Sequence, residues 1–286
     1  MNDSSNVAVA VAPADVAPAG ITRKTFFEAN ESSILGMGFI AAVLAIWEVV
    51  PRIFTLSKAT QLFFATPSQV MGALYDLFAT GEIWPALEFS ATAFTVGLLL
   101  SIAVALPVGV VLGRSTSMNA MFDPFVTAFN ATPRLVFLPI VLIWFGIGMN
   151  TVVIIVFIGA VFPLLINTYE GVKNADKLLI NVVRSFGARE WKINTLVVLP
   201  NSMPYIIAGL RLAIGRAILG IVVAEFFGGT TTGVGVIMVN ASGKYQVDLV
   251  FAGLVLFMAI SLVMTSAVRV LEQRLSRWRP EKVKNF

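Results

Sequence analysis

Three charged residues interrupt otherwise apolar stretches of this sequence: Arg134, Arg216 and Glu225. An ionisable side chain at bilayer depth costs about 2.5–3.5 kcal/mol on insertion scales, so it faces protein interior or water. Arg134 directly follows Pro133, where an interrupted helix could line a cavity. Arg216 and Glu225 are nine residues apart, about two and a half helical turns, and therefore point to opposite sides of one helix.

These charges allow two interpretations. In the first, Arg134, Arg216 and Glu225 border a polar pathway, whose arginines favour anionic or polar solutes. In the second, Arg216 pairs with a carboxylate or with carbonyl groups of a neighbouring helix. The two interpretations remain open at the level of sequence.

Other chemistry is disfavoured by the residue types. The chain contains no Cys and no His, so the usual metal ligands and the usual general base near neutral pH are missing. We expect no catalytic residues, no metal site and no bound cofactor. A phosphate-binding loop needs Gly five positions before a Gly-Lys pair, but that position, ahead of Gly243-Lys244, is Met238. The sequence therefore predicts no nucleotide-binding site in this chain.

The composition sets the environment of these residues. Hydrophobic residues make up 57% of the 286 and charged residues 13%, against about 25% charged in soluble domains. The sequence predicts an all-α, polytopic membrane protein with about six transmembrane helices. The expected spans are 33–50, 88–114, 123–147, 152–168, 204–227 and 250–268, and an amphipathic helix is expected over 68–79.

Orientation follows from the distribution of Lys and Arg. With the N-terminus inside, the inner segments hold fourteen of these residues and the outer segments three. Both termini are then cytoplasmic. We expect a flexible cytoplasmic tail over 1–32, one transmembrane domain over 33–275 with a cytoplasmic loop over 169–200, and a basic cytoplasmic tail over 276–286. The basic excess reflects topology, so no nucleic-acid partner is expected, and lipid is the natural surrounding.

The cytoplasmic loop carries the most informative pattern. Residues 181–200 form two short helical pieces hinged at Gly187, with Arg184, Arg189, Glu190 and Lys192 on them. Such an amphipathic projection suits docking into a groove on a soluble partner. The alternative is a solvated loop between two spans. The Gly/Thr-rich stretch 228–235 is expected to be a flexible outer turn or gate.

This loop resembles the cytoplasmic signature of permease subunits of binding-protein-dependent ABC importers, which reads Glu-Ala-Ala, three residues, Gly, nine residues, Ile, one residue, Leu-Pro. Gly187, Leu199 and Pro200 match it, whereas Asn181, Val182 and Val183 replace the leading Glu-Ala-Ala. The resemblance implies docking of an ATPase on Asn181, Val182, Val183, Arg184, Ser185, Phe186, Gly187, Ala188, Arg189, Leu199 and Pro200.

Further stretches, such as Thr66-Pro67-Ser68, Ala224 to Gly228 and Gly233-Val234-Gly235, look similar to the nitrate/sulfonate/taurine branch. This resemblance implies a type I ABC importer (MetI-like) permease fold in a bacterial inner membrane. It also implies two copies of an ATPase subunit, a second permease copy in a homodimer, and an extracytoplasmic substrate-binding protein.

Two other classes compete with this interpretation. A secondary transporter driven by an ion gradient favours midplane carboxylates and internal repeats, whereas Arg is the main midplane charge here. A membrane-embedded enzyme would need clustered acids, His or Cys, which the sequence does not offer.

Overall fold

The computed structural model describes residues 26–53 and 63–275, and this part of the chain consists of helices and their connections, without strands. Two compact units, 1–49 and 50–286, are distinguished. The first contributes most of α1 (Phe26–Ile53), a long apolar helix that includes a candidate span over Ile34–Ile53. The tail predicted over 1–32 lies mostly, and the tail over 276–286 entirely, outside the described residues.

Among the described residues, five helical stretches are long and apolar enough to cross a membrane, or six if one bent pair counts as a span. They are Ile34–Ile53, Ile83–Arg114, Met149–Lys173, Glu190–Phe226 and Val247–Val270, and the bent pair is Thr116–Ala131 with Arg134–Phe145. The all-α fold with about six spans is thereby confirmed. The amphipathic helix expected over 68–79 is α3 (Pro67–Ala79), whose Val70, Ala73 and Leu77 are buried.

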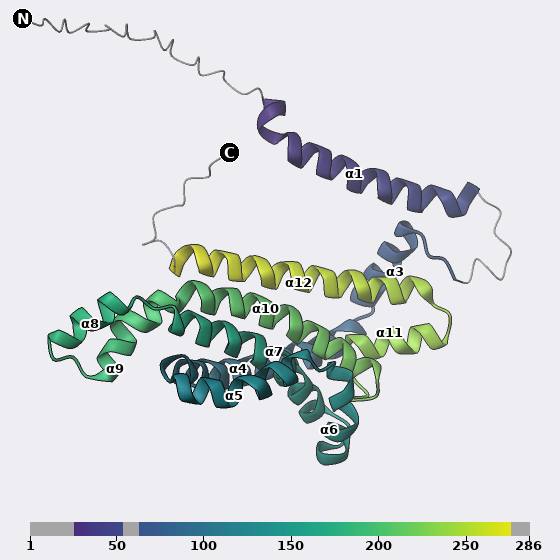
Figure 1. Cartoon of the computed structure of the whole chain (residues 1–286). Helices are drawn as coiled ribbons and strands as arrows, with labels where there is room; N and C mark the ends of the chain where they lie inside the picture. Colours follow the sequence, from purple (N-terminus) through teal and green to yellow (C-terminus); the bar gives the residue numbers. More distant parts are fainter. Residues whose placement is uncertain (1–25, 54–62, 276–286) are drawn as a thin grey trace, which may run out of the picture. The chain divides into compact units, whose positions relative to one another are not determined.

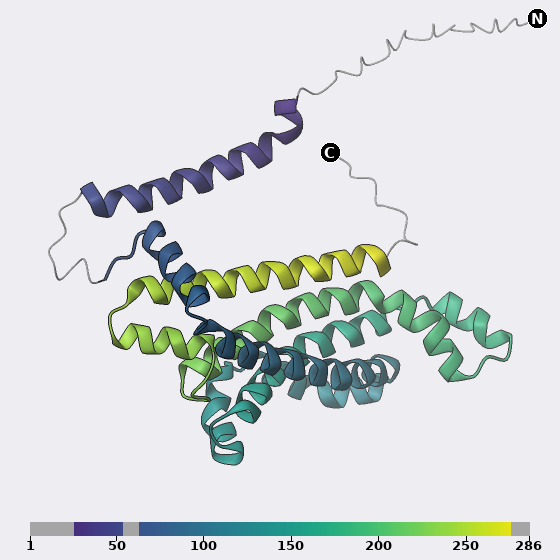
Figure 2. The same ribbon diagram turned by 180° about the vertical axis from the view of Figure 1, so that it is seen from behind.

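Helix α7 (Met149–Lys173) forms the centre of the second unit. It packs against α4 (Ile83–Arg114) and against α10 (Leu199–Phe226), and α12 (Val247–Leu275) lies along α10 (Figure 1). The same order of helices is visible from behind in Figure 2. Most of the apolar part of α7 is buried inside the protein. A helix on the outside of a membrane bundle would instead expose its apolar side chains to lipid, so α7 is an inner helix.

Small residues allow these helices to approach closely. A Cβ on Gly97 of α4 would lie 2.6 Å from Val156 Cγ1 of α7, and one on Gly220 of α10 would lie 3.1 Å from Val156 Cα. Van der Waals contact between backbones is a main source of helix association in lipid, where apolar side chains gain little from leaving their surroundings. The α4–α7–α10 layer therefore behaves as one tightly packed body.

The third expected span, 123–147, is not one continuous helix. Instead α5 (Thr116–Ala131) ends before Pro133, a 3₁₀ turn η1 (Arg134–Phe137) follows, and α6 (Leu138–Phe145) leaves at a bend of 97°. Pro133 has no backbone N–H, and its ring pushes the preceding Thr132 into an extended conformation, φ −71° and ψ 129°. The break places Arg134 at the bend.

The remaining helices are short. They are α8 (Lys177–Ser185), α9 (Glu190–Ile193), the π turn η2 (Asn194–Val198) and α11 (Val234–Gly243). The first three form the connection between α7 and α10, at one end of the bundle, and α11 connects α10 to α12 at the other (Figure 1).

Candidate functional site

Helix α8 begins at a well-formed cap. The Asp176 carboxylate accepts a hydrogen bond from the Leu178 backbone N–H at 2.8 Å, as an N-cap residue does. Ile180 is buried and Val183 is half-buried, whereas Val182 and Phe186 are exposed, Phe186 at 87%. Because residues four apart lie on one face of a helix, Leu178, Val182 and Phe186 form an exposed apolar row. We call this row the apolar tip.

Gly187 ends α8 in a left-handed conformation, φ +78°. Its N–H bonds to the Arg184 carbonyl at 2.9 Å, and the Ala188 N–H bonds to the Val183 carbonyl at 3.4 Å. These two bonds are those of a Schellman motif, in which Gly stands where a side chain would be strained. The hinge predicted at Gly187 is therefore present as a fixed turn.

Gly187→Ala is expected to loosen this turn, because a left-handed conformation costs a residue with a Cβ about 1–2 kcal/mol. Amide hydrogen exchange at Gly187 and Ala188 should accelerate by roughly 5- to 30-fold. Gly187→Asn is the matched control, since Asn tolerates this conformation, and its exchange should stay closer to that of the native chain. Equal acceleration in both variants would contradict the role of the turn.

The connection between α7 and α10 has a core of its own. Val172, Ala175, Ile180, Ile193, Val197 and Val198 are buried together, with Val183 and Ala188 packed against them. The loop predicted over 169–200 is thus a folded projection, in which α7 continues to Lys173 before α8 begins. We call the folded segment 174–198 the knob.

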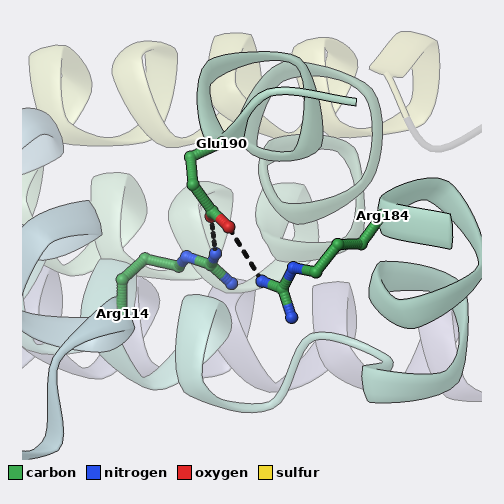
Figure 3. Close-up of polar contacts among 3 residues, drawn as sticks. All are labelled: Arg114, Arg184 and Glu190. Carbon is green, nitrogen blue, oxygen red and sulfur yellow. Dashed lines mark hydrogen bonds and ion pairs between the residues drawn. The ribbon is translucent and has the colours of Figure 1, made fainter. Parts of the chain in front are cut away.

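An ion-pair bridge joins the knob to the bundle. The Glu190 carboxylate accepts hydrogen bonds from Arg184, at 2.9 Å, and from Arg114, the last residue of α4 (Figure 3). The helical stretch from Glu190 to Phe226 has 37 residues and would be about 55 Å long, well beyond the roughly 30 Å hydrocarbon core, so its polar start projects from the bilayer. In this position outside the hydrocarbon core, the hydrogen bond from Arg184, and to a smaller extent the one from Arg114, lower the pKa of Glu190.

The Leu199-Pro200 pair that ends the signature has a structural explanation. Pro200 stands in the first turn of α10, directly after the π turn η2. A proline ring collides with the carbonyl four residues earlier in a regular helix, and a π turn is one way to relieve this. Leu199 is half-buried against the main core, and only Pro200 of the two is exposed. Both residues set the exit of the chain from the knob into α10.

The residues expected to dock the ATPase therefore fall into two groups, one exposed on the surface of the knob and one packed into its interior. Asn181, Val182, Arg184, Ser185, Phe186, Gly187 and Arg189 are exposed on the knob, while Val183, Ala188 and Leu199 pack inward. The sequence analysis missed the exposed Leu178 and Trp191, the latter 71% exposed. The four-residue spacing of Leu178, Val182 and Phe186 was the signal that could have found Leu178.

Arg134 and Arg216 are brought together from 82 positions apart. Both approach Gly159 of α7: a Cβ there would lie 3.1 Å from Arg134 Nε and 2.9 Å from the Arg216 carbonyl oxygen. Arg134 is half-buried, and its Nε is buried without a hydrogen-bond partner among the described residues. Arg216 is exposed and forms no salt bridge within the described ranges, so the pairing with a carboxylate considered above is not found there.

Glu225 lies away from the two arginines, as the helical spacing predicts. Its side chain is 2% exposed and accepts hydrogen bonds from Ser90 Oγ at 2.5 Å and from the Gly235 N–H at 2.6 Å. Glu225 is thus surrounded by the protein itself. Across residues 26–53 and 63–275, no three acidic side chains gather where they could hold a metal ion.

Comparison with known proteins agrees with this geometry. Residues 105–277 match the family described as binding-protein-dependent transport system inner membrane component. The chain is 32% identical over 244 residues to the aliphatic sulfonates transport permease protein SsuC of Bacillus subtilis (strain 168), covering 85% of this chain and 87% of that protein. It is 29% identical over 253 residues to the taurine transport system permease protein TauC of Escherichia coli (strain K12), covering 86% and 90%.

Among solved structures, an inward-facing conformation of the MetNI methionine ABC transporter has a similar fold. The TM-score is 0.57 at 19% identity, over 68% of this chain and 94% of that chain. The fold is therefore that of a MetI-like permease of a type I importer, as the resemblance implied. This chain belongs to the family of binding-protein-dependent transport system inner membrane components, and it is a multi-pass permease component of an ABC importer in the inner membrane.

Proposed function

We propose that this chain forms the translocation pathway for a small polar or anionic solute, of the sulfonate, taurine or nitrate kind, and that the knob couples it to a separate ATPase. The observation that supports this proposal is the knob itself, a folded projection whose apolar tip is exposed to water. Large exposed apolar side chains in such an arrangement mark a protein-binding surface. The names of the relatives, which refer to sulfonates and taurine, support the class of solute.

In the proposed mechanism, two ATPase subunits bind ATP and Mg²⁺ and each takes one knob into a groove. The apolar tip supplies buried area at this contact, and Arg189 and Asn181 lie at its polar edge. Closure of the ATPase dimer moves the two knobs. Because Glu190 ties the knob to Arg114 of α4, and Leu199 continues it into α10, the movement reaches the packed helices as a rigid-body rotation.

Arg134 and Arg216 form the proposed selective part of the pathway. Arg216 lies on an exposed face of α10, and a charged side chain at bilayer depth does not face lipid. We infer that a second copy of this chain covers this face and that water and solute occupy the space between the copies. Glu225, which was considered with the arginines, is enclosed by the protein and takes no part in this proposal.

The topology belongs to the same proposal. We infer that both termini are cytoplasmic, with the tails 1–32 and 276–286 flanking one domain over 33–275, and the Lys/Arg distribution supports this orientation. An extracytoplasmic binding protein then delivers the solute at the end of the bundle opposite the knob. The knob carries Lys177, Arg184, Arg189 and Lys192, which is the expected charge for the inner side.

Capture of the ATPase tests this function. Val182→Asp and Phe186→Asp each place a charge in the apolar tip, and the loss of an apolar hot spot of this kind should weaken capture of the ATPase by at least about 30-fold. Tyr75→Asp is the control, since Tyr75 is similarly exposed but lies on α3, away from the knob. Capture that is unchanged in both knob variants would overturn the proposal, as would equal loss in the control.

A further inference from the structure

Helix α10 joins two polar arrangements that lie at opposite ends of the bundle. It begins at Leu199, directly after the knob, and its 28 residues extend about 42 Å to Phe226. The knob end is tied to α4 by Glu190, and the other end carries Glu225. The proposed function accounts for the first arrangement and leaves the second without a role.

Glu225 connects three helices. Its carboxylate accepts from Ser90 Oγ of α4 and from the Gly235 N–H in the first turn of α11, and the Val234 N–H donates to the same Ser90 Oγ at 3.2 Å. These bonds satisfy two of the N–H groups that a helix start leaves without partners, and the negative charge lies at the positive end of α11. We call Glu225, Ser90 and the first turn of α11 the latch.

The latch leaves no room for side chains. A Cβ on Gly233 would overlap the Glu225 carboxylate, and one on Gly235 would lie 2.8 Å from Glu225 Cβ. The preceding turn is also bonded, since the Gly229 N–H donates to the Ala224 carbonyl and the Gly148 N–H to the Gly229 carbonyl, both at 2.7 Å. The Gly/Thr stretch 228–235, predicted as a flexible turn or gate, is therefore held at its two ends to α10 and to the start of α7.

Helix α11 has a second, different attachment. Its ten residues reach only about 15 Å, half of a bilayer's hydrocarbon core, so it cannot span. One turn further along α11, Met238 packs against Gly253 of α12 so closely that Gly253 has no space for a Cβ. Apolar packing thus holds α11 to α12, while the latch holds it to α10 and α4.

A buried carboxylate is an expensive way to cap a short helix, because its charge must be removed from water, and a Ser or Asp at the surface would serve α11 alone. What the burial of Glu225 adds is a connection between helices 135 positions apart in the sequence. We propose that Glu225 is a positioning residue for transport, which makes α11 follow the movement of α10 and α4 at the end of the bundle opposite the knob. This inference rests on the proposed function, in which the knob moves α10.

The test uses the full complex of permease, ATPase and binding protein in proteoliposomes, with taurine as the probe solute. Glu225→Gln keeps the shape but removes the charge and one of the two acceptor oxygens. We expect the amount of taurine moved per ATP hydrolysed to fall about tenfold, with ATPase capture unchanged. Ser90→Ala should lower the ratio in the same direction. Ser90→Thr should restore it, because Ser90 borders a cavity of about 310 Å³ that can take a methyl group.

Two matched controls lie on α4, the helix that carries Ser90. Glu88→Gln removes an exposed carboxylate two positions from Ser90, and Thr95→Ala removes an exposed hydroxyl that donates to the Ala91 carbonyl of its own helix. Neither should change the ratio. A ratio that stays native in Glu225→Gln, or a Glu225→Gln chain that no longer assembles with the ATPase, would overturn the proposal, the latter by making Glu225 a folding residue.

A distance measurement separates coupling from simple stability. Because the sequence has no Cys, single cysteines can be introduced at exposed Thr92 of α4 and Asn240 of α11 for spin labels. In the native complex the distance between the two labels should stay the same through the ATP cycle. In Glu225→Gln the distribution of this distance should broaden on ATP binding. An unchanged distribution contradicts the inference. Failure of the proposed function is distinguishable, because it would appear in the Val182→Asp and Phe186→Asp capture experiment with the latch intact.

Discussion

Arg134→Gln and Arg216→Gln are each expected to raise the KM for an anionic solute by about 10- to 150-fold, while ATPase capture stays native. The range corresponds to the roughly 1.5–3 kcal/mol of a hydrogen bond to a charged group. Arg134 Nε and the backbone carbonyl oxygen of Arg216 both lie close to Gly159, and neither arginine side chain has a carboxylate partner in the described part of the chain. We therefore expect an anionic solute to interact with these two positive charges.

The measurement is uptake of taurine, of a short alkanesulfonate and of nitrate by the reconstituted complex with its binding protein. Arg216→Lys should recover part of the loss, because a positive charge is restored without the planar pair of donors. Arg269→Gln is the control, since Arg269 is exposed near the end of α12. Native uptake in both Gln variants would remove Arg134 and Arg216 from the pathway, and a similar loss in Arg269→Gln would show a general effect of charge removal.

The sequence predicted those features that depend on local patterns. The spans follow from the absence of charge over a bilayer's thickness, and the turn at Gly187 follows from a glycine between two amphipathic pieces. Helical geometry alone predicts that the side chains of Arg216 and Glu225 point to opposite sides of their helix. The structure agrees, since Arg216 is exposed and Glu225 is buried. Each of these needs only residues within a few turns of each other.

The features that sequence reasoning missed depend on distant pairs. Nothing near Glu225 in the sequence identifies Ser90 as its partner, because that contact arises only when α4 and α10 both pack against α7 and against each other. The same holds for Arg114 with Glu190. The bend after α5 was partly predictable, since Pro133 was recognised as an interruption, but its angle depends on how α6 packs on α7.

Gly97→Ala is expected to destabilise the permease, although the same change usually favours a helix. The added Cβ would lie 2.6 Å from Val156 Cγ1 and 2.9 Å from the Val153 carbonyl oxygen. The valine methyl can rotate away, but Val156 Cβ, at 2.8 Å, and the Val153 carbonyl are fixed to the backbone of the buried helix α7 and cannot move alone. Overpacking of this kind costs about 1–3 kcal/mol, which exceeds the roughly 0.5–1 kcal/mol that Ala gains over Gly in a helix.

Thermal unfolding of the detergent-purified chain, followed by size-exclusion chromatography, measures this effect. Gly72→Ala is the matched control, because Gly72 lies within α3 and has nothing within 4 Å of its Cβ position, so the substitution should be neutral or stabilising. Adding Val156→Ala to Gly97→Ala should recover only part of the loss, since the Val153 carbonyl and the Cβ of residue 156 remain. Full recovery would locate the clash in the side chain alone, and an unchanged melting temperature in Gly97→Ala would mean that α4 and α7 are not packed through their backbones. The close approach of these two helices is what allows a displacement of the knob to reach α4, α7 and α10 together, so the single variant tests the rigidity on which the proposed coupling depends.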